Sequence, residues 1–194
     1  MNPTTRKGSS PISNTAFLVM DVQQGIVSRV QDERYLPRLV EGGEAARGAG
    51  IPVIHVVLGF RAGHPECAPR NKTFSALPPG AFVEGDPSAA IHPDVAPRPG
   101  EVVVTKKRVS AFTGSDLALV LRSAGIDHLV LTGIATSGVV LSTLRQAADL
   151  DYRLTVLSDG CYDPDPEVHE VLIGKVFARQ AEVTSIGEWS ATLA

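Results

Sequence analysis

Short uninterrupted apolar runs alternate along the chain with longer segments in which apolar residues recur at helical spacing. An apolar run of four to eight residues is typical of a strand buried on both faces of a parallel sheet, and the longer segments indicate amphipathic helices. The pattern predicts strands at 16–20, 51–58, 102–104, 128–132, 154–157 and 181–184. It predicts helices at 33–48, 115–123, 139–150 and 167–177.

This regular alternation of strands and helices predicts an α/β fold, a three-layer α/β/α sandwich with a mainly parallel sheet. The chain has 194 residues, a length that suits one hydrophobic core of about 100–200 residues. We therefore expect a single domain over 15–194, preceded by a polar, flexible N-terminal arm over 1–14. No internal repeat is visible.

Composition and charge narrow the class of ligand. With 43% hydrophobic and 20% charged residues the chain is typical of globular proteins, and its net charge of -3 gives no indication of nucleic acid or an anionic membrane as partner. We expect a small-molecule substrate. Its two cysteines lie outside any disulfide framework or metal-ligand spacing, and no apolar run is long enough to span a bilayer, so we expect a cytoplasmic protein.

Polar residues at the carboxyl ends of parallel strands are the first candidates for chemistry, because ligands of open α/β sheets bind there. Asp21 follows the first apolar run, Lys106 ends the run at 102–104, and a turn rich in small residues, 133–138, follows the strand at 128–132. A desolvated Asp facing a Lys suits proton transfer, and the turn could offer backbone N–H groups to an oxyanion. The alternatives are a capping aspartate, a solvated lysine and a turn chosen for packing.

The segment 59–100 is rich in proline and glycine and predicts a long functional loop. Its Arg61 and Asn71 are candidates for substrate binding, and solvated loop side chains are the alternative. The turn at 133–138 contains neither of the glycine-rich phosphate-binding patterns, so we do not expect a nucleotide.

Three segments together resemble the isochorismatase-like hydrolases, also called the cysteine hydrolase family, over nearly the whole chain: Leu18-Val19-Met20-Asp21-Val22-Gln23, Val104-Thr105-Lys106-Lys107-Arg108-Val109-Ser110-Ala111-Phe112, and Leu131-Thr132-Gly133-Ile134-Ala135-Thr136. The resemblance implies that Asp21 and Lys106 are catalytic. It also implies a cis peptide bond between Ile134 and Ala135, and an oxyanion hole made by the N–H groups of Ala135 and Val139. Gln23 and Phe112, which lie within the motifs, are further candidates for substrate binding.

The family's amidases carry a nucleophilic cysteine shortly after the third motif, and here Val139 occupies that position. Shifting the alignment by one residue offers Gly138 or Val140, and neither can form a thioester. The metal ligands of the family's nicotinamidases have no counterpart after residue 54, so we expect neither a metal nor another cofactor. By the same resemblance we expect a homo-oligomer, a dimer or a tetramer.

Three hypotheses follow for the function. In the first, the protein is a hydrolase that works through Asp21 and Lys106 without a cysteine nucleophile, as the resemblance implies for isochorismatase itself, where an Asp protonates an enol ether. In the second, it binds a small molecule and has lost catalysis. In the third, it is an amidase that recruits Cys67 or Cys161.

Overall fold

The computed structural model describes residues 14–193, which form one six-stranded sheet in the order β3-β2-β1-β4-β5-β6. All five neighbouring strand pairs are parallel. The first strand lies near the middle of the sheet, and its six residues are all buried, which explains why its sequence is a continuous apolar run. The strands are β1 (Thr15–Met20), β2 (Val53–Leu58), β3 (Val102–Lys106), β4 (His128–Ile134), β5 (Arg153–Tyr162) and β6 (Glu182–Thr184).

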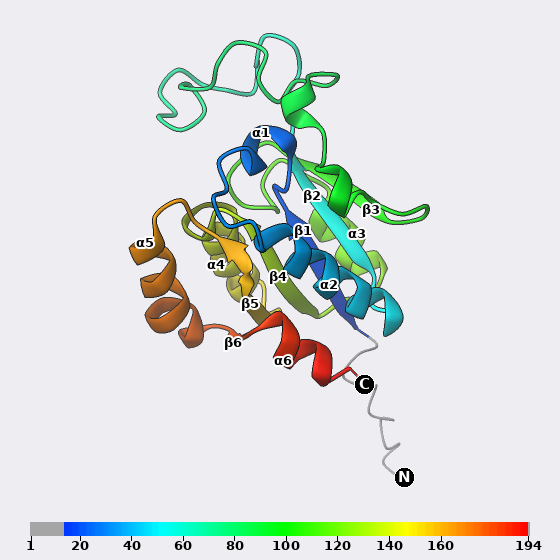
Figure 1. Cartoon of the computed structure of the whole chain (residues 1–194). Coiled ribbons are helices and arrows are strands. Elements are labelled where there is room, and N and C mark those ends of the chain that lie inside the picture. Colours follow the sequence, from blue (N-terminus) through cyan, green and yellow to red (C-terminus); the bar gives the residue numbers. More distant parts are fainter. Residues whose placement is uncertain (1–13, 194) are drawn as a thin grey trace.

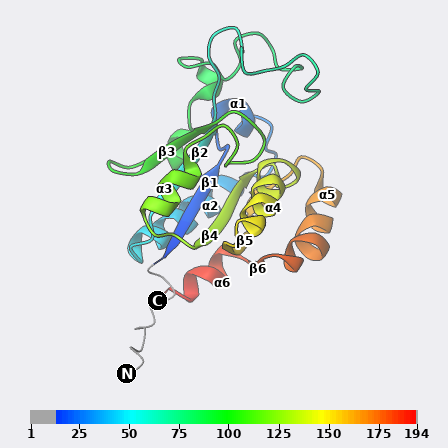
Figure 2. The same cartoon turned by 180° about the vertical axis from the view of Figure 1, so that it is seen from behind.

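Helices cover both faces of the sheet, so the predicted three-layer α/β/α fold is confirmed. One face carries α2 (Tyr35–Gly48) and α6 (Ile186–Ala191), and the other carries α3 (Leu117–Ser123) and α4 (Leu141–Asp149) (Figures 1 and 2). Two shorter helices are α1 (Gln24–Val27), which follows β1, and α5 (Pro166–Val171), which follows β5. The carboxyl ends of the strands all meet at one edge, where the candidate residues were expected.

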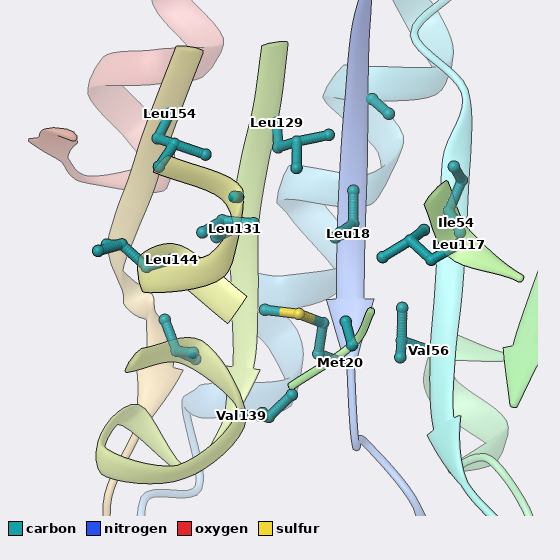
Figure 3. Close-up of a cluster of buried hydrophobic side chains, with 14 of the residues drawn as sticks. Leu18, Met20, Ile54, Val56, Leu117, Leu129, Leu131, Val139, Leu144 and Leu154 are labelled. Carbon is teal, nitrogen blue, oxygen red and sulfur yellow. The ribbon is translucent and has the colours of Figure 1, made fainter. Parts of the chain in front are cut away.

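Alternate residues of the strands build two separate cores. Leu18 and Met20 of β1 pack into the core beneath α3 and α4, whereas Phe17 and Val19 pack into the core beneath α2 and α6. Figure 3 shows the first of these cores, with aliphatic side chains from β1, β2, β4 and α4 in contact across the sheet face. This alternation is what the two-residue period of a strand requires when both faces are covered.

The predicted elements are present, and their ends differ by a few residues in most cases. The strand predicted at 154–157 runs on to Tyr162 with an irregularity in its pairing to β4. The helix predicted at 139–150 is preceded by a π-helical turn, Thr136–Val140, before α4 begins, and α5 likewise runs into a π-helical segment, Leu172–Val176, and a 3₁₀ turn, Phe177–Arg179. Helical periodicity does not distinguish these tighter and wider windings from an α-helix.

The segment 59–100 projects beyond the carboxyl ends of the strands (Figure 1) and contains two 3₁₀ turns, Pro87–Ala89 and Pro93–Val95. It buries a small apolar cluster of its own, made with the end of β2: Leu58, Phe60, Phe74 and Phe82. Of the arm predicted at 1–14, residues 1–13 lie outside the described part of the chain. The carbonyl of Asn14 accepts hydrogen bonds from the N–H groups of Asp127 and His128. Over residues 14–193 no helix is long and apolar enough to cross a membrane.

Candidate active site

Asp21 and Lys106 meet at the carboxyl edge of the sheet although their strands are not neighbours. Strand β2 lies between β1 and β3, and the long lysine side chain spans it, so that Lys106 Nζ lies 2.9 Å from Asp21 Oδ2. The two side chains are only 2% and 9% exposed. The ammonium also donates a hydrogen bond to the carbonyl of Arg108 at 3.0 Å. Lys106 is therefore a buried partner of Asp21, and the alternative of a solvated surface lysine is wrong.

The Asp21 carboxyl group has two unequal oxygens. Oδ2 is bound by the ammonium, whereas Oδ1 is buried and has no hydrogen-bond partner among the described residues. Burial raises the pKa of Asp21 above its ordinary value, and the charge and hydrogen bond of Lys106 oppose that rise without cancelling it. A buried ionised oxygen without a donor is costly, so the proton of the neutral form belongs on Oδ1.

The backbone holds Asp21 in an uncommon conformation. Its φ of 58° lies in the left-handed region, and its N–H donates to the carbonyl of Val56 at 2.8 Å. That hydrogen bond extends the pairing between β1 and β2 by one residue before the chain turns into α1. The bond fixes the carboxyl group at the strand end, where aspartate tolerates the left-handed conformation better than most residues.

The turn after β4 has the cis peptide bond between Ile134 and Ala135 that the resemblance implies. Gly133 precedes it with a φ of 142°, and a Cβ at this position would lie 2.3 Å from the carbonyl oxygen of Met20. Only glycine therefore allows β4 to pass this close to β1. Beyond the cis bond, the N–H of Gly138 donates to the carbonyl of Ala135 at 3.0 Å, which closes the turn before α4.

The side chain of Val139 is an integral part of the core. It is 2% exposed and packs with Met20 and the other residues of the cluster beneath α3 and α4 (Figure 3). The surroundings of both cysteines disfavour the thiolate form. Cys161 is buried, its Sγ lies 3.8 Å from the carbonyl of Leu131, and burial raises its pKa, while the pKa of Cys67 is also raised by burial. A raised pKa disfavours the thiolate, which is the nucleophilic form of cysteine.

Two of the predicted substrate-binding residues make structural contacts. The amide of Gln23 is fully buried: its Nε2 donates to the carbonyls of Leu58 and Ala89 at 2.9 and 2.8 Å, and its Oε1 accepts from the N–H of Leu58 at 2.8 Å. Gln23 thus ties the ends of β1 and β2 to the long loop. The ring of Phe112 is 8% exposed and packs 5.9 Å from the ring of Tyr152 in the core. Both side chains are engaged in these contacts, and their roles in substrate binding stay predictions.

The two loop candidates are held within the loop. Arg61 is 76% exposed and forms an ion pair of 2.7 Å with Glu66, and Asn71 Oδ1 accepts a hydrogen bond from the N–H of Phe74 at 3.1 Å. Arg61 lines a cavity of about 790 Å³ between the ends of β2 and β3 and the loop, and neither Asp21 nor Lys106 lines that cavity. The structure therefore does not bring Arg61 or Asn71 to the Asp–Lys pair.

The structure adds two residues at the turn that the sequence pattern did not indicate. The carboxylate of Asp163 accepts a hydrogen bond from the N–H of Ser137 at 2.8 Å, and His169 Nδ1 lies 2.8 Å from the hydroxyl of Thr136. Asp163 follows β5 directly, and this position at a strand end was the available signal for it. Within residues 14–193, no group of three or more His, Cys, Asp or Glu side chains is placed to hold a metal ion.

The comparisons with known proteins agree on the family that this chain resembles. The isochorismatase domain model matches residues 15–188. The chain belongs to the isochorismatase family, a family of hydrolases. A ureidoacrylate amidohydrolase, RutB, of Stutzerimonas stutzeri is 32% identical over 198 residues, which cover 90% of this chain and 76% of RutB. The uncharacterized isochorismatase family protein YecD of Escherichia coli O157:H7 is also 32% identical, over 90% of this chain and 93% of YecD.

Solved structures of the isochorismatase family share the whole architecture. An isochorismatase family protein from Burkholderia thailandensis superposes with a TM-score of 0.82 at 31% identity, over 93% of this chain and 96% of that one. The six-stranded sheet and the helical layers are thus those of an isochorismatase-like fold. Family membership makes the carboxyl edge of the sheet, where Asp21 and the cis turn meet, the candidate active site.

Proposed function

We propose that this isochorismatase-family protein hydrolyses a small metabolite by proton transfer from Asp21, with Lys106 as its charged partner and without a cysteine nucleophile. One observation carries the proposal: Asp21 Oδ1 is buried and has no hydrogen-bond partner within residues 14–193, beside an oxygen held by Lys106. Burial raises the pKa of this carboxyl group, which favours the protonated form that a general acid requires. The aliphatic side chain of Val139, packed in the core, leaves the turn without a thiol.

An enol ether is the substrate class that suits such a site. Oδ1 delivers its proton to the terminal carbon of the vinyl group, and the carbon bonded to the ether oxygen becomes an oxocarbenium ion. Water adds to that ion, and the resulting hemiketal loses its alcohol to leave a ketone. Asp21 regains a proton from the attacking water, so protons balance over the cycle. Lys106 stabilises the carboxylate that exists between the two transfers.

Two other functions have a specific observation in their favour. RutB is a ureidoacrylate amidohydrolase, and an amide or ureido substrate would use the N–H groups of Ala135 and Val139 as an oxyanion hole while Asp21 activates water as a base. A binding protein without catalysis is the other candidate, and it rests on the absence of a thiol at position 139 together with the buried, raised-pKa thiol of Cys161. The raised pKa of Asp21 favours the acid over the base.

The test compares isochorismate, as an enol ether, with a panel of primary amides and N-carbamoyl compounds in D₂O. Protonation of carbon by Asp21 places one solvent deuterium in the methyl group of the pyruvate released, which mass spectrometry detects, whereas amide hydrolysis places no deuterium on carbon. We expect Asp21→Asn to reduce the rate by at least a hundredfold, because it removes the transferable proton. Unchanged turnover in this variant would refute the proposal, and no turnover of any compound would favour the binding protein.

Val139→Cys is the complementary variant. If the turn is otherwise built as in the family's amidases, the new thiol would give amide hydrolysis that the unmodified protein lacks. Retention of enol-ether hydrolysis by the same variant would show that the acid chemistry does not depend on position 139.

We further propose that the protein is a cytoplasmic homo-oligomer, a dimer or a tetramer. Family membership supports self-association, as do Val102 and Val103, which are 39% and 44% exposed on the edge strand β3. Light scattering coupled to gel filtration tests the oligomeric state directly.

A further inference from the structure

Two consecutive residues of the cis turn are held from outside the turn by one short segment of chain. The N–H of Ser137 donates to Asp163 Oδ2 at 2.8 Å, and the hydroxyl of Thr136 lies 2.8 Å from His169 Nδ1. Both partners come from the end of β5 and the start of α5, and they reach the turn from 26 and 33 residues away. The turn that links β4 to α4 is thus fastened to the neighbouring strand and helix.

Two hydrogen bonds fix the position of the Asp163 side chain. Its side chain is buried and both carboxylate oxygens are used, since Oδ1 accepts from the N–H of Asp165 at 3.2 Å. One oxygen therefore fixes Asp163 to its own chain, and the other fixes Ser137 to Asp163. A hydrogen bond from a backbone N–H to a carboxylate is among the stronger kinds in proteins.

The start of α5 fixes the position of His169. Asp165 caps the first turn of α5 by accepting from the N–H groups of Glu167 and Val168, and the N–H of His169 donates to the carbonyl of Asp165 at 3.0 Å. His169 therefore lies one helical turn after a fixed helix start. Its partner Thr136 is fully buried, so the Thr136 end of this hydrogen bond is shielded from water.

Water has access to the other side of these two residues. Asp163 and His169 line a cavity of about 570 Å³, together with Cys161 and Tyr162 of β5 and Glu170 of α5. The turn contributes no lining residue to this cavity. Asp163 and His169 thus lie between this cavity and the turn, and each contacts both.

We infer that Asp163 and His169 are positioning residues, which fix the cis turn beside Asp21 at the carboxyl edge of the sheet. The inference rests on the proposed function. Thr136 and Ser137 lie between Ala135 of the cis bond and Gly138, whose N–H closes the turn, so a change in their orientation shifts the turn relative to Asp21. Displacement of about 1 Å at an active site is enough to reduce a rate by about a hundredfold.

The test uses variants of the full-length protein and separates positioning from binding and folding. His169→Leu removes the hydrogen bond to Thr136, and His169→Asn restores a polar group near the place of Nδ1. Glu170→Gln is the matched control, because Glu170 lies on the same helix and lines the same cavity but makes no hydrogen bond or ion pair with the turn among the described residues. Kinetics with isochorismate would give kcat and KM, and thermal unfolding would give Tm.

We expect His169→Leu to lower kcat by roughly tenfold to a hundredfold with KM changed less than threefold, and His169→Asn to restore much of the loss. Thr136→Val should have the same effect as His169→Leu, and the double variant should be no worse than either single one, since both remove the same interaction. Asp163→Asn, which keeps one acceptor oxygen, should give an intermediate kcat. Equal losses in kcat for His169→Leu and Glu170→Gln, or additive losses in the double variant, would overturn the inference.

Amide hydrogen exchange provides a readout that does not depend on catalysis. We expect the amides of residues 135–139 to exchange faster in His169→Leu and Asp163→Asn than in the unmodified protein and in Glu170→Gln. If the unmodified protein hydrolyses nothing but these amides still respond, the proposed function fails and the positioning of the turn stands. If isochorismate is hydrolysed and neither kcat nor exchange responds, the positioning fails alone.

Discussion

The buried pair of Lys106 and Asp21 makes a quantitative prediction about stability. Lys106→Met keeps the length and apolar stem of the side chain but removes the ammonium, which leaves Asp21 as a buried group without a cationic partner. Removing one partner of a buried ion pair costs about 3–5 kcal/mol. For a domain of this size that corresponds to a fall in Tm of roughly 6–20 °C.

The loss of stability in Lys106→Met should depend on pH in a defined direction. The pKa of Asp21 is already raised by burial, and the variant removes the two effects of Lys106 that oppose the rise. In the folded variant, Asp21 therefore keeps its proton up to a higher pH than it does in the unfolded chain. The stability of the variant falls as pH rises from the unfolded pKa of Asp21 to its folded pKa. The deficit relative to the unmodified protein should be smallest near pH 4, where Asp21 is neutral, and should grow toward neutral pH.

Urea unfolding monitored by circular dichroism, repeated between pH 4 and pH 8, measures this deficit. Lys175→Met is the matched control, because Lys175 is exposed, and it should change stability by less than about 0.5 kcal/mol. The double variant Lys106→Met with Asp21→Asn should recover part of the loss, since no buried charge remains. A loss below about 1 kcal/mol for Lys106→Met, or a loss independent of pH, would refute the reasoning.

Three further predictions concern the scaffold. Gly133→Ala should destabilise the protein by on the order of 4 kcal/mol or more in urea unfolding, because its Cβ would lie 2.3 Å from the Met20 carbonyl oxygen. Burial raises the pKa of Glu101, but Arg47 and further hydrogen bonds lower it to about 2. Glu101→Gln should therefore cost about 3 kcal/mol at neutral pH, a difference that disappears as pH falls from about 4.5 to 2. Phe112→Ala should cost about 3–5 kcal/mol in the same assay, as expected for a core ring.

Each of these has an outcome that would contradict it. Gly174→Ala, where a Cβ would meet nothing within 4 Å, is the control for Gly133→Ala, and equal stability of the two variants would show that the close approach of β4 to β1 is not limiting. A constant deficit for Glu101→Gln from pH 7 to pH 2 would exclude the ion pair as its cause. A stable Phe112→Ala variant with altered KM would show that Phe112 contributes to substrate binding and not to the stability of the core.

The sequence by itself determined the architecture, because strand and helix periods are local properties of the chain. A continuous apolar run such as β1 is buried on both faces of a parallel sheet, so alternating runs and amphipathic segments predicted the three layers. The same reasoning placed Asp21 and Lys106 at strand ends that meet at one edge. The match of three motifs in order added the turn and its cis bond, which no local pattern would have indicated.

Only the tertiary structure decided which polar side chains remain available for a ligand, because hydrogen-bond partners come from distant parts of the chain. The amide of Gln23 forms hydrogen bonds with residues 35 and 66 positions away in the sequence. The turn after β4 is held by Asp163, at the end of β5, and by His169 of α5. Likewise, no group in the described part of the chain donates a hydrogen bond to Asp21 Oδ1, and this depends on how all the neighbouring elements pack around it. A sequence specifies which groups can form hydrogen bonds, and packing determines which of them are left unsatisfied.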